Sequence, residues 1–491
     1  MKRPNILPVP CSAAPGAASG TACRSRSLHR LAGIVLAGVL AGCAITDTPA
    51  PTPAEPPASF RHAPAAPAPD AGDLALPPAD EWWRSFDDPV LDELARRAAV
   101  GNEDIRAAVA RVSNARAILA GQRARLWPSI GVSTSISRAD AGRNDSPSTR
   151  YGLGADASWE VDLWGRVSRA VELGESGLSA SIADEAALRL SIQASLVQTY
   201  LQLRGAERRE SLLDGSVAIA HRLLELSQIR YESGVVDRAD VLQAQTQLAN
   251  VETQRSELRI SRAQLEHALA LLVGVPPSEL AIAPSASLPG RPELPALLPA
   301  QVLARRPDVA AARHRVIAAH AAIGLAESAD LPTLGLSGSA GFGGSELGRL
   351  ISAPALAWSL GAALAKNLVD GGQTDAASAQ ARAEAEESVA AYRRLVLEAL
   401  VEVEDNLVAV EQLHQQAALQ EVALEAARHT LEIVEAQYRE GTVSFLNVAT
   451  AQSQLQGAEI ALSEARLRLL LASAGLLRNA GGRWHPPAAP S

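Results

Sequence analysis

The chain contains the stretch YESGVVDRADVLQAQTQLANVETQRSELR at residues 231–259, and a diverged copy, YREGTVSFLNVATAQSQLQGAEIALSEAR, at residues 438–466. The two stretches share 12 identities in 29 positions at a shift of 207. A second pair, residues 104–133 and 308–337, shares 10 identities in 30 positions at a shift of 204. Self-similarity at a nearly constant spacing indicates a repeated structural unit. The sequence therefore predicts a tandem duplication.

The duplication sets the predicted domain organisation. We expect a first repeat at 81–275 and a second repeat at 301–480. A bridge at 276–300 contains seven prolines and joins the repeats, and a tail follows at 481–491. The two repeats are thus expected to form equivalent halves of one folded body.

Each repeat begins with a helix, continues with two strands and ends in a long helical hairpin. Residues 148–275 and 355–485 contain no proline, so helices much longer than three turns are permitted there. Leucine and valine recur at spacings of four and three or at intervals of seven, which predicts coiled-coil packing. The residues in these series are Val396, Leu400, Val403, Leu407 and Val410; Val251, Leu258, Leu265 and Leu272; and Leu455, Leu462, Leu469 and Leu476.

Four short segments have a period of two instead, which is typical of strands. Apolar residues alternate with small or polar ones at about 130–137 and 153–161, and more weakly at 334–342 and 356–364. Each segment is close to the ~9–11 residues of a tilted membrane-spanning strand. A hairpin that caps a soluble helical bundle is the alternative. If the strands lie in lipid, four of them cannot close a barrel around a lumen, so several subunits must contribute.

The N-terminus has the pattern of a signal peptide. Residues 1–42 contain five basic and no acidic residues, an apolar run of ten from Leu31 to Leu40, and small residues directly before Cys43. Ten apolar residues are too few to span a bilayer, which requires ~20, so we expect cleavage rather than anchoring by a helix. A cysteine directly after the cleavage site can also carry a lipid, and ordinary cleavage without a lipid on Cys43 is the alternative. Residues 43–80 are dominated by Pro and Ala and are expected to form an extended tether.

Charge and motifs argue against several classes of protein. The net charge is −9, and the chain from residue 43 onward carries −14, so nucleic acid is not an expected partner. No P-loop, G-x-S-x-G elbow or dinucleotide fingerprint is present, so we expect no enzymatic activity. His314 and His320 are six residues apart, which is the wrong spacing for an i, i+4 metal pair, and no metal is expected.

Several motifs together resemble the outer membrane factors, the TolC-like channels, and especially their lipoprotein branch in multidrug efflux of the RND type. The resemblance covers residues 80–480. No single motif is very specific, but their order along the chain is. They are Trp82-Trp83, Asn102-x-Asp104, Pro128, the run Trp159–Arg166, the run Leu368–Gly372, and Tyr-x-x-Gly at Tyr231/Gly234 and Tyr438/Gly441.

The resemblance implies a mainly α fold with membrane β-strands, built from two tandem repeats of helix, strand, strand and long helical hairpin. Three chains would form a homotrimer with a 12-stranded β-barrel continuous with a periplasmic coiled-coil tunnel, and with an equatorial belt around the tunnel. Resemblance to the lipobox implies that Cys43 carries N-palmitoyl and S-diacylglycerol groups and anchors the protein in the outer membrane. No other cofactor is expected.

The implied function is passive export of drugs or other small toxic compounds through a gated tunnel. The implied partners are a periplasmic adaptor and an inner membrane transporter of the RND type, with Gly234 and Gly441 at the hairpin tips that the adaptor contacts. One alternative is a conduit for type I protein secretion. Another is a periplasmic coiled-coil structural lipoprotein without a pore.

The same resemblance implies a periplasmic gate formed by Asp237, Asp240, Tyr231 and Tyr438. A ring of Asp240 side chains around a narrow pore would raise local cation occupancy. A turn residue or helix N-cap is the alternative role for Asp237.

The second tip departs from the pattern of relatives. Asn447 stands at the position that corresponds to Asp240, and Val443 stands where some relatives have Arg. The gate is therefore expected to be less negative, and the Tyr438 contact to lack one candidate partner.

Overall fold

A computed structural model describes residues 57–62, 79–140, 147–294, 299–351 and 356–479. The chain divides into two units, 1–48 and 49–491, and all described residues belong to the second. Cys43 and the signal segment therefore lie outside the described residues, as does the predicted tail at 481–491. Among the described helices, none is both long enough and apolar enough to cross a bilayer.

The two repeats have the same order of elements, which confirms the predicted fold class. The predicted first repeat opens with a 3₁₀ helix η1 (Ala79–Phe86) and helix α2 (Pro89–Gly101). It continues with α3 (Glu103–Ala124), β1 (Ser129–Ala139), β2 (Ser148–Val161), α4 (Arg166–Glu232) and α5 (Arg238–Val273). After η2 (Pro277–Glu279) and α6 (Pro299–Arg305), the second contains α7 (Pro307–Ser328), β3 (Thr333–Gly344), η3 (Leu347–Arg349), β4 (Leu356–Ala365), α8 (Gln373–Glu440) and α9 (Phe445–Asn479).

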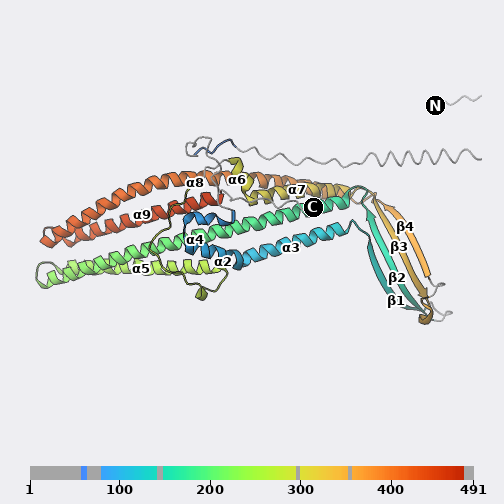
Figure 1. The fold of residues 1–491 in the computed structure, drawn as a ribbon, viewed down its shortest axis with the longest axis horizontal. Helices are drawn as coiled ribbons and strands as arrows, with labels where there is room; N and C mark the ends of the chain where they lie inside the picture. The colour runs from blue at the N-terminus through green and yellow to red at the C-terminus, as the bar shows by residue number, and fades with distance from the viewer. Residues whose placement is uncertain (1–56, 63–78, 141–146, 295–298, 352–355, 480–491) are drawn as a thin grey trace, which may run out of the picture. The chain divides into compact units, whose positions relative to one another are not determined.

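Helices α4 and α8 are the longest elements, with 67 and 68 residues. At 1.5 Å per residue each is ~100 Å long, so each must pack on several partners along its length. Figure 1 shows the α4–α5 and α8–α9 turns at one end of these helices and the strands at the other. The predicted coiled-coil residues face partner helices, because Val396, Val403, Leu462 and Leu469 are buried.

A capped turn starts α8 directly after the sheet. Gly371 and Gly372 have positive φ, which glycine adopts without strain. The Asp370 carboxylate accepts hydrogen bonds from the Thr374 hydroxyl at 2.5 Å, and from the N–H groups of Thr374 and Gly372 at 2.9 Å. These bonds, the Thr374 hydroxyl foremost, lower the pKa of Asp370 to about 2. This turn fixes the direction in which α8 leaves the sheet.

The four strands form one antiparallel sheet in the order β1-β2-β3-β4, which leaves β1 and β4 at its edges within the described residues. Because side chains alternate between faces, the register places Gly131, Asp156, Ser339 and Ser359 in one row on one face. That face consists mostly of Gly, Ser and Ala. A Cβ on Gly131 would lie 3.1 Å from the Asp156 carboxylate, so glycine makes room for this charge.

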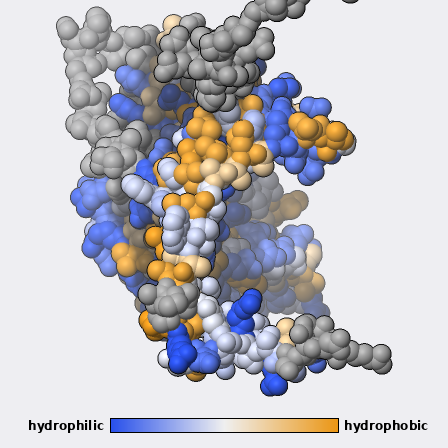
Figure 2. Space-filling view, turned by 90° about the vertical axis from the view of Figure 1, so that its right-hand side faces the viewer, coloured by the Kyte–Doolittle hydropathy of each residue, from blue (hydrophilic) through white to orange (hydrophobic). Residues whose placement is uncertain are grey.

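The opposite face of the sheet is apolar and exposed. Its exposed large side chains include Ile130, Val132, Ile136, Trp358, Leu360 and Leu364. Figure 2, which looks at the sheet end, shows apolar residues beside the pale small residues of the strands. A continuous apolar face of this kind marks contact with lipid or with another protein.

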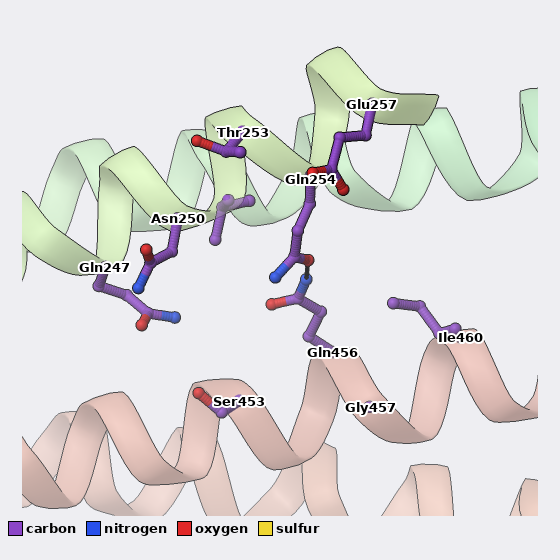
Figure 3. Close-up of a pocket in the computed structure, with 10 residues that line it drawn as sticks. Gln247, Asn250, Thr253, Gln254, Glu257, Ser453, Gln456, Gly457 and Ile460 are labelled. Carbon is purple, nitrogen blue, oxygen red and sulfur yellow. Dashed lines mark hydrogen bonds between the residues drawn. The ribbon is translucent and has the colours of Figure 1, made fainter. Parts of the chain in front are cut away.

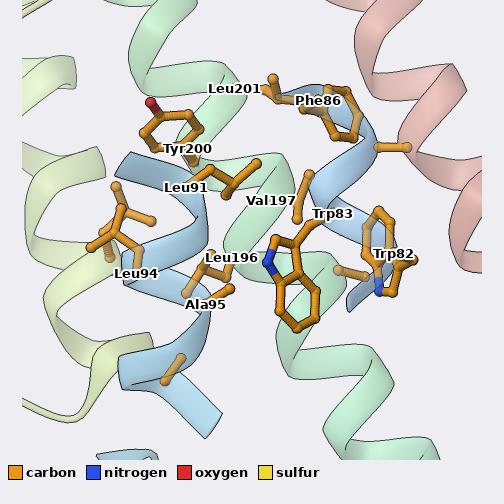
Figure 4. Packing of buried hydrophobic residues seen from close by; sticks show 14 of the residues in the cluster. Trp82, Trp83, Phe86, Leu91, Leu94, Ala95, Leu196, Val197, Tyr200 and Leu201 are labelled. Atoms are coloured by element: carbon orange, nitrogen blue, oxygen red, sulfur yellow. The ribbon is translucent and has the colours of Figure 1, made fainter. Parts of the chain in front are cut away.

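The main core lies halfway along the helical body, around α4. It joins η1 and α2 to α4, α5 and α9, with Trp82, Trp83 and Phe86 packed against Leu91, Leu196, Val197 and Leu201 (Figure 4). Residues of the Pro-rich bridge, among them Leu280, Ile282 and Leu288, cover this cluster. The bridge and the N-terminal segment thus meet at the middle of the helices.

A buried polar network reinforces this core. The hydroxyl of Tyr200 donates to Asp88 at 2.6 Å and accepts from the Arg204 guanidinium at 2.9 Å. Arg204 and Glu207 are both 3 % exposed, lie 2.6 Å apart, and Arg204 also donates to the Ala283 carbonyl at 2.9 Å. Burial and the hydrogen bond to Asp88 raise the pKa of Tyr200. The network ties the N-terminal segment and the bridge to α4.

Candidate gate at the hairpin tips

The two long hairpins turn through the same kind of motif. Gly234 and Gly441 have φ values of +72° and +79°. In the first turn the N–H of Val235 donates to the Arg230 carbonyl at 2.9 Å, and in the second the N–H of Thr442 donates to the Gln437 carbonyl at 3.0 Å. This is the Schellman pattern, in which glycine supplies the left-handed residue that ends a helix. The predicted Tyr-x-x-Gly tips are therefore helix ends.

Tyr438 fastens the tip of the second hairpin to the first. Its side chain is 1 % exposed, and its ring meets Phe445 edge-on with centroids 6.1 Å apart. The Arg230 guanidinium of α4 lies over the ring, 4.6 Å from the centroid, and donates a 2.5 Å hydrogen bond to the Tyr438 carbonyl. The Tyr438 hydroxyl and the Ser227 hydroxyl lie 3.3 Å apart. We call Ser227, Arg230, Tyr438 and Phe445 the latch.

An apolar cluster surrounds the latch and includes residues from four helices and the second turn. Leu223 of α4, Ala244 of α5, and Leu431 and Val448 of the second hairpin are buried in it. Val443 packs against the cluster, as suits its apolar side chain. Val443 stands where some relatives have an arginine that could contact the tyrosine. In this chain Arg230 of α4 provides that contact to Tyr438 instead.

The acidic residues of the first tip lie apart from the latch in the candidate gate. Asp237 is exposed at the start of α5 and its side chain caps no N–H group, although its carbonyl accepts the N–H of Asp240 at 3.1 Å. Asp240 is half-buried in the first turn of α5, and Tyr231 is 45 % exposed. In the described part of the chain, the polar partners of Tyr438 are Ser227 and Arg230 rather than either aspartate.

At the second tip, Asn447 takes part in a local turn. Its side-chain oxygen accepts a hydrogen bond from the Ser444 hydroxyl at 2.9 Å at the start of α9. The amide of Asn447 thus stands where the first tip has the Asp240 carboxylate, while Glu440 remains exposed next to Gly441. The two tips also differ in their tyrosines, because Tyr438 is buried in the latch and Tyr231 is exposed.

A polar groove of about 490 Å³ separates the returning helices α5 and α9 (Figure 3). The side-chain amide of Gln456 donates to that of Gln254 at 2.9 Å across the groove. Gln452, which is 2 % exposed, donates to the Ser216 carbonyl of α4 at 3.4 Å. Asn250, Gln247, Glu257 and Ser453 are among the other lining residues. The contact between α5 and α9 is therefore polar on the side of the apolar tip cluster that faces away from the turns. We call this row of glutamines the glutamine seam.

The sequence alone missed Arg230, Ser227, Phe445 and the glutamine seam. Arg230 precedes Tyr231, the repeat counterpart of Tyr438, but Gln437 stands at the equivalent position in the second repeat. An internal comparison therefore gave no reason to select it. One signal was available in the sequence. When the two tips are aligned, Arg230 of the first tip falls one position before Tyr438 of the second.

Comparison with known proteins assigns the chain to a family. The profile of the outer membrane efflux protein family matches residues 94–275 and 298–482. This chain belongs to the outer membrane efflux protein family. Its members are channel proteins rather than enzymes.

Several curated relatives match over nearly their whole length. The pyoverdine export outer membrane protein OpmQ of Pseudomonas aeruginosa is 31 % identical over 93 % of this chain and 98 % of its own length. The toluene efflux pump outer membrane protein TtgC of Pseudomonas putida is 29 % identical over 94 % of this chain and 96 % of its own length.

Solved structures agree in fold. The outer-membrane channel OprN superposes with a TM-score of 0.82 at 31 % identity, covering 89 % of this chain and 99 % of OprN. The open state of the MtrE outer membrane channel of Neisseria gonorrhoeae gives 0.77 at 27 % identity, over 89 % of this chain and 98 % of MtrE. The efflux-channel function predicted from the sequence is thereby confirmed: the chain is an outer membrane component of an efflux system.

Proposed function

We propose that three copies of this chain form a lipid-anchored channel that conducts small organic compounds out of the periplasm. The sheet supports an assembly of this kind. Its outer face is apolar and its edge strands β1 and β4 each have one unpaired side within the described residues. Unpaired backbone groups in hydrocarbon cost several kcal/mol each, so strands from neighbouring copies must close the barrel. The Gly- and Ser-rich face then lines the lumen.

Lipidation of Cys43 belongs to the same proposal. The support is the sequence before it, in which a ten-residue apolar run ends in small residues and a cysteine. N-palmitoyl and S-diacylglycerol groups on Cys43 would hold the mature chain at the outer membrane with its helices in the periplasm. Two or more acyl chains suffice for stable anchoring.

The gate carries the functional proposal. The single observation behind it is that Tyr438 seats between Arg230, Ser227 and Phe445 and so joins the two hairpins of one chain at their tips. Breaking these contacts frees the second tip without disturbing the core around Trp82. The tunnel therefore opens when the latch is released, and Asp240, Asp237 and Tyr231 shape the charge at its mouth.

The surface near the latch supports the proposed partners. The glycine tips at Gly234 and Gly441 and the polar groove along Gln254 and Gln456 offer a helical adaptor both a docking end and hydrogen-bonding groups. We assign the adaptor to a proton-driven inner membrane transporter of the RND type. Relatives are named for export of pyoverdine, toluene and antibiotics, which supports small organic compounds as cargo here.

Crosslinking in living cells tests the assignment. Cysteines introduced at Ser233 and Val235 flank the first tip, and a control cysteine at Val100 occupies an 80 % exposed position on α2, at the middle of the body. We expect the tip cysteines, but not the control, to capture an adaptor together with a proton-driven exporter. Capture with an ATP-driven exporter would transfer the protein to type I secretion. Capture of structural proteins alone, with no conductance in planar bilayers, would contradict the channel.

A further inference from the structure

One ion pair near the sheet has opposite polarity in the two repeats. In the first repeat Arg123 of α3 donates to Glu175 of α4 at 2.7 Å. In the second repeat Arg382 of α8 donates to Glu327 of α7 at 2.6 Å. The shift of 204 aligns Arg123 with Glu327, and the shift of 207 aligns Glu175 with Arg382. The same contact thus occurs twice, with the cation and the anion exchanged.

The apolar contact beside this pair is the same in both repeats. We call α3 and α7 the entry helices, because each precedes the strands of its repeat. Leu119 of α3 packs with Leu178 of α4, and a Cβ on Gly174 would lie 3.3 Å from the Leu119 side chain. Ile323 of α7, the counterpart of Leu119, packs with Ala381 of α8, the counterpart of Gly174. Because apolar contacts are non-directional, this part of the interface accepts either entry helix.

Ion pairs within the long hairpins keep their polarity. Arg259 of α5 donates to Glu210 of α4 at 2.9 Å. Its counterpart Arg466 of α9 donates to Glu421 of α8 at 2.5 Å. In both hairpins the cation therefore lies on the returning helix. The turns that join the paired helices are only five and four residues long, at 233–237 and 441–444, so the chain itself fixes which helices pair.

The entry helices are connected to their long helices much less directly. Residues 125–165, 41 in number, separate α3 from α4, and residues 329–372, 44 in number, separate α7 from α8. An entry helix also reaches the long helix of the other repeat, because Arg315 of α7 pairs with Asp184 of α4. The polarity is thus reversed at the contact whose partner is not fixed by a short turn.

Exchange of the two entry helices would bring like charges together. Arg123 would meet Arg382, and Glu327 would meet Glu175. In the native arrangement Arg123 and Glu175 are 44 % and 46 % exposed, and a pair this exposed contributes little to stability. It contributes more to the choice of partner, because specificity is the difference in free energy between the right and the wrong pairing.

We propose that these two ion pairs select the long helix on which each entry helix packs. Each long helix accepts the entry helix of its own repeat and repels that of the other repeat, in the same chain or in a neighbouring copy. Selection between copies rests on the proposed trimer, whereas selection within one chain does not. The partner is therefore the chain's own second repeat, and charge polarity distinguishes it from the first.

Reversing one pair tests the selection without removing an ion pair. The double variant Arg123→Glu/Glu175→Arg keeps a cation opposite an anion in each repeat, but both repeats then have the same polarity. Charge no longer distinguishes the entry helices in this variant. The quadruple variant, which adds Glu327→Arg and Arg382→Glu, restores opposite polarity and is the matched control.

Disulfides report the pairing in the full-length protein. A Cβ on Gly174 would lie 3.8 Å from the Leu119 Cβ. This separation equals the ~3.8 Å that is usual in a disulfide, so Leu119→Cys with Gly174→Cys reports the native contact. Leu119→Cys with Ala381→Cys reports the exchanged contact. After mild oxidation, we expect at least about fivefold more exchanged disulfide in the double variant than in the wild-type or quadruple background.

Three results would overturn the selection. One is a double variant with no more exchanged disulfide than wild type. Another is a quadruple variant that exchanges as much as the double variant, because opposite polarity would then have no effect. The third is loss of the native disulfide in the double variant without a gain of the exchanged one. Non-reducing gels separate disulfides within a chain from those between copies, so a wild-type protein that forms no trimer would contradict the proposed channel and leave the test within one chain intact.

Discussion

Removing the latch arginine should favour the open channel. Arg230→Ala deletes the guanidinium that lies 4.6 Å from the Tyr438 ring centroid and its 2.5 Å hydrogen bond to the Tyr438 carbonyl. Arg238→Ala is the matched control, because it removes an equal charge from an exposed position at the same tip. Tyr438→Phe is the graded variant, since it removes only the interaction with the Ser227 hydroxyl at 3.3 Å.

The contacts of Arg230 and Tyr438 set the free energy by which each substitution is expected to favour the open tip. A cation over an aromatic ring contributes about 0.5–2 kcal/mol, and a hydrogen bond from a charged donor about 1.5–3 kcal/mol. Arg230 is half-buried, so we take about 2–3 kcal/mol per subunit, which corresponds to a shift of roughly 30- to 150-fold toward the open tip. Tyr438→Phe removes one hydrogen bond between neutral groups, which predicts about 0.5–1 kcal/mol, or roughly two- to fivefold.

Single-channel recording in planar bilayers measures the effect directly. We expect conductance and open probability to rise in the order wild type, Tyr438→Phe, Arg230→Ala, with Arg238→Ala equal to wild type. Cells carrying Arg230→Ala should also become sensitive to a large antibiotic that an intact outer membrane excludes. If Arg230→Ala lowers thermal stability but leaves conductance and antibiotic exclusion unchanged, the latch is structural and does not control opening.

Four further variants probe the tips, the core and the strand-to-helix turn. Gly441→Ala and Gly234→Ala should each cost about 1–2 kcal/mol of local strain at positive φ, which thermal denaturation checks; the methyl at position 441 would meet the latch guanidinium at 3.4 Å, an ordinary contact, so neither substitution should raise conductance. Glu207→Ala should lower the free energy of unfolding by about 3–5 kcal/mol, because Arg204 is left as an unpaired buried charge; denaturant titration checks this. Asp370→Asn should lower the thermal midpoint at pH 6. Because the folded-state pKa of Asp370 is depressed to about 2, the difference from wild type should shrink as the pH falls from about 4 toward 2.

Local patterns in the sequence were sufficient for the elements. The absence of proline from residues 148–275 predicted helices much longer than three turns there, and the structure has α4 at Arg166–Glu232. Alternation predicted a strand at 356–364, and β4 occupies Leu356–Ala365. Both signals depend only on residues close together in the sequence, so they can be recognised without knowledge of the tertiary contacts.

Contacts between distant segments were not predictable in this way. Arg230 and Tyr438 are 208 residues apart and meet because two ~100 Å helices end at the same level. Arg204 and Glu207 resemble an ordinary i, i+3 surface pair, and only the covering bridge makes them buried. Phe60 stands in a stretch whose composition argues against packing, yet it is buried against Val403 of α8 and Leu476 of α9. In each case the role of the residue depends on a distant partner that the local sequence does not identify.

The distribution of apolar and polar contacts along the hairpins supports the proposed opening at the tips. Around Trp82 the hairpins share an extensive apolar core, and separating them there would expose large buried side chains at about 25 cal/mol per Å². Between α5 and α9 the contact is the Gln254–Gln456 pair across a groove, and water can replace such a hydrogen bond at a net cost of about 0.5–1.5 kcal/mol. Near the turns the latch and its small cluster hold the hairpins together, and farther along Gln452 of α9 donates to the Ser216 carbonyl of α4. In the proposed mechanism the hairpins splay about a fixed equator once Arg230 leaves the Tyr438 ring, because the contacts that must break near the tips are few and partly polar, whereas the core around Trp82 stays intact.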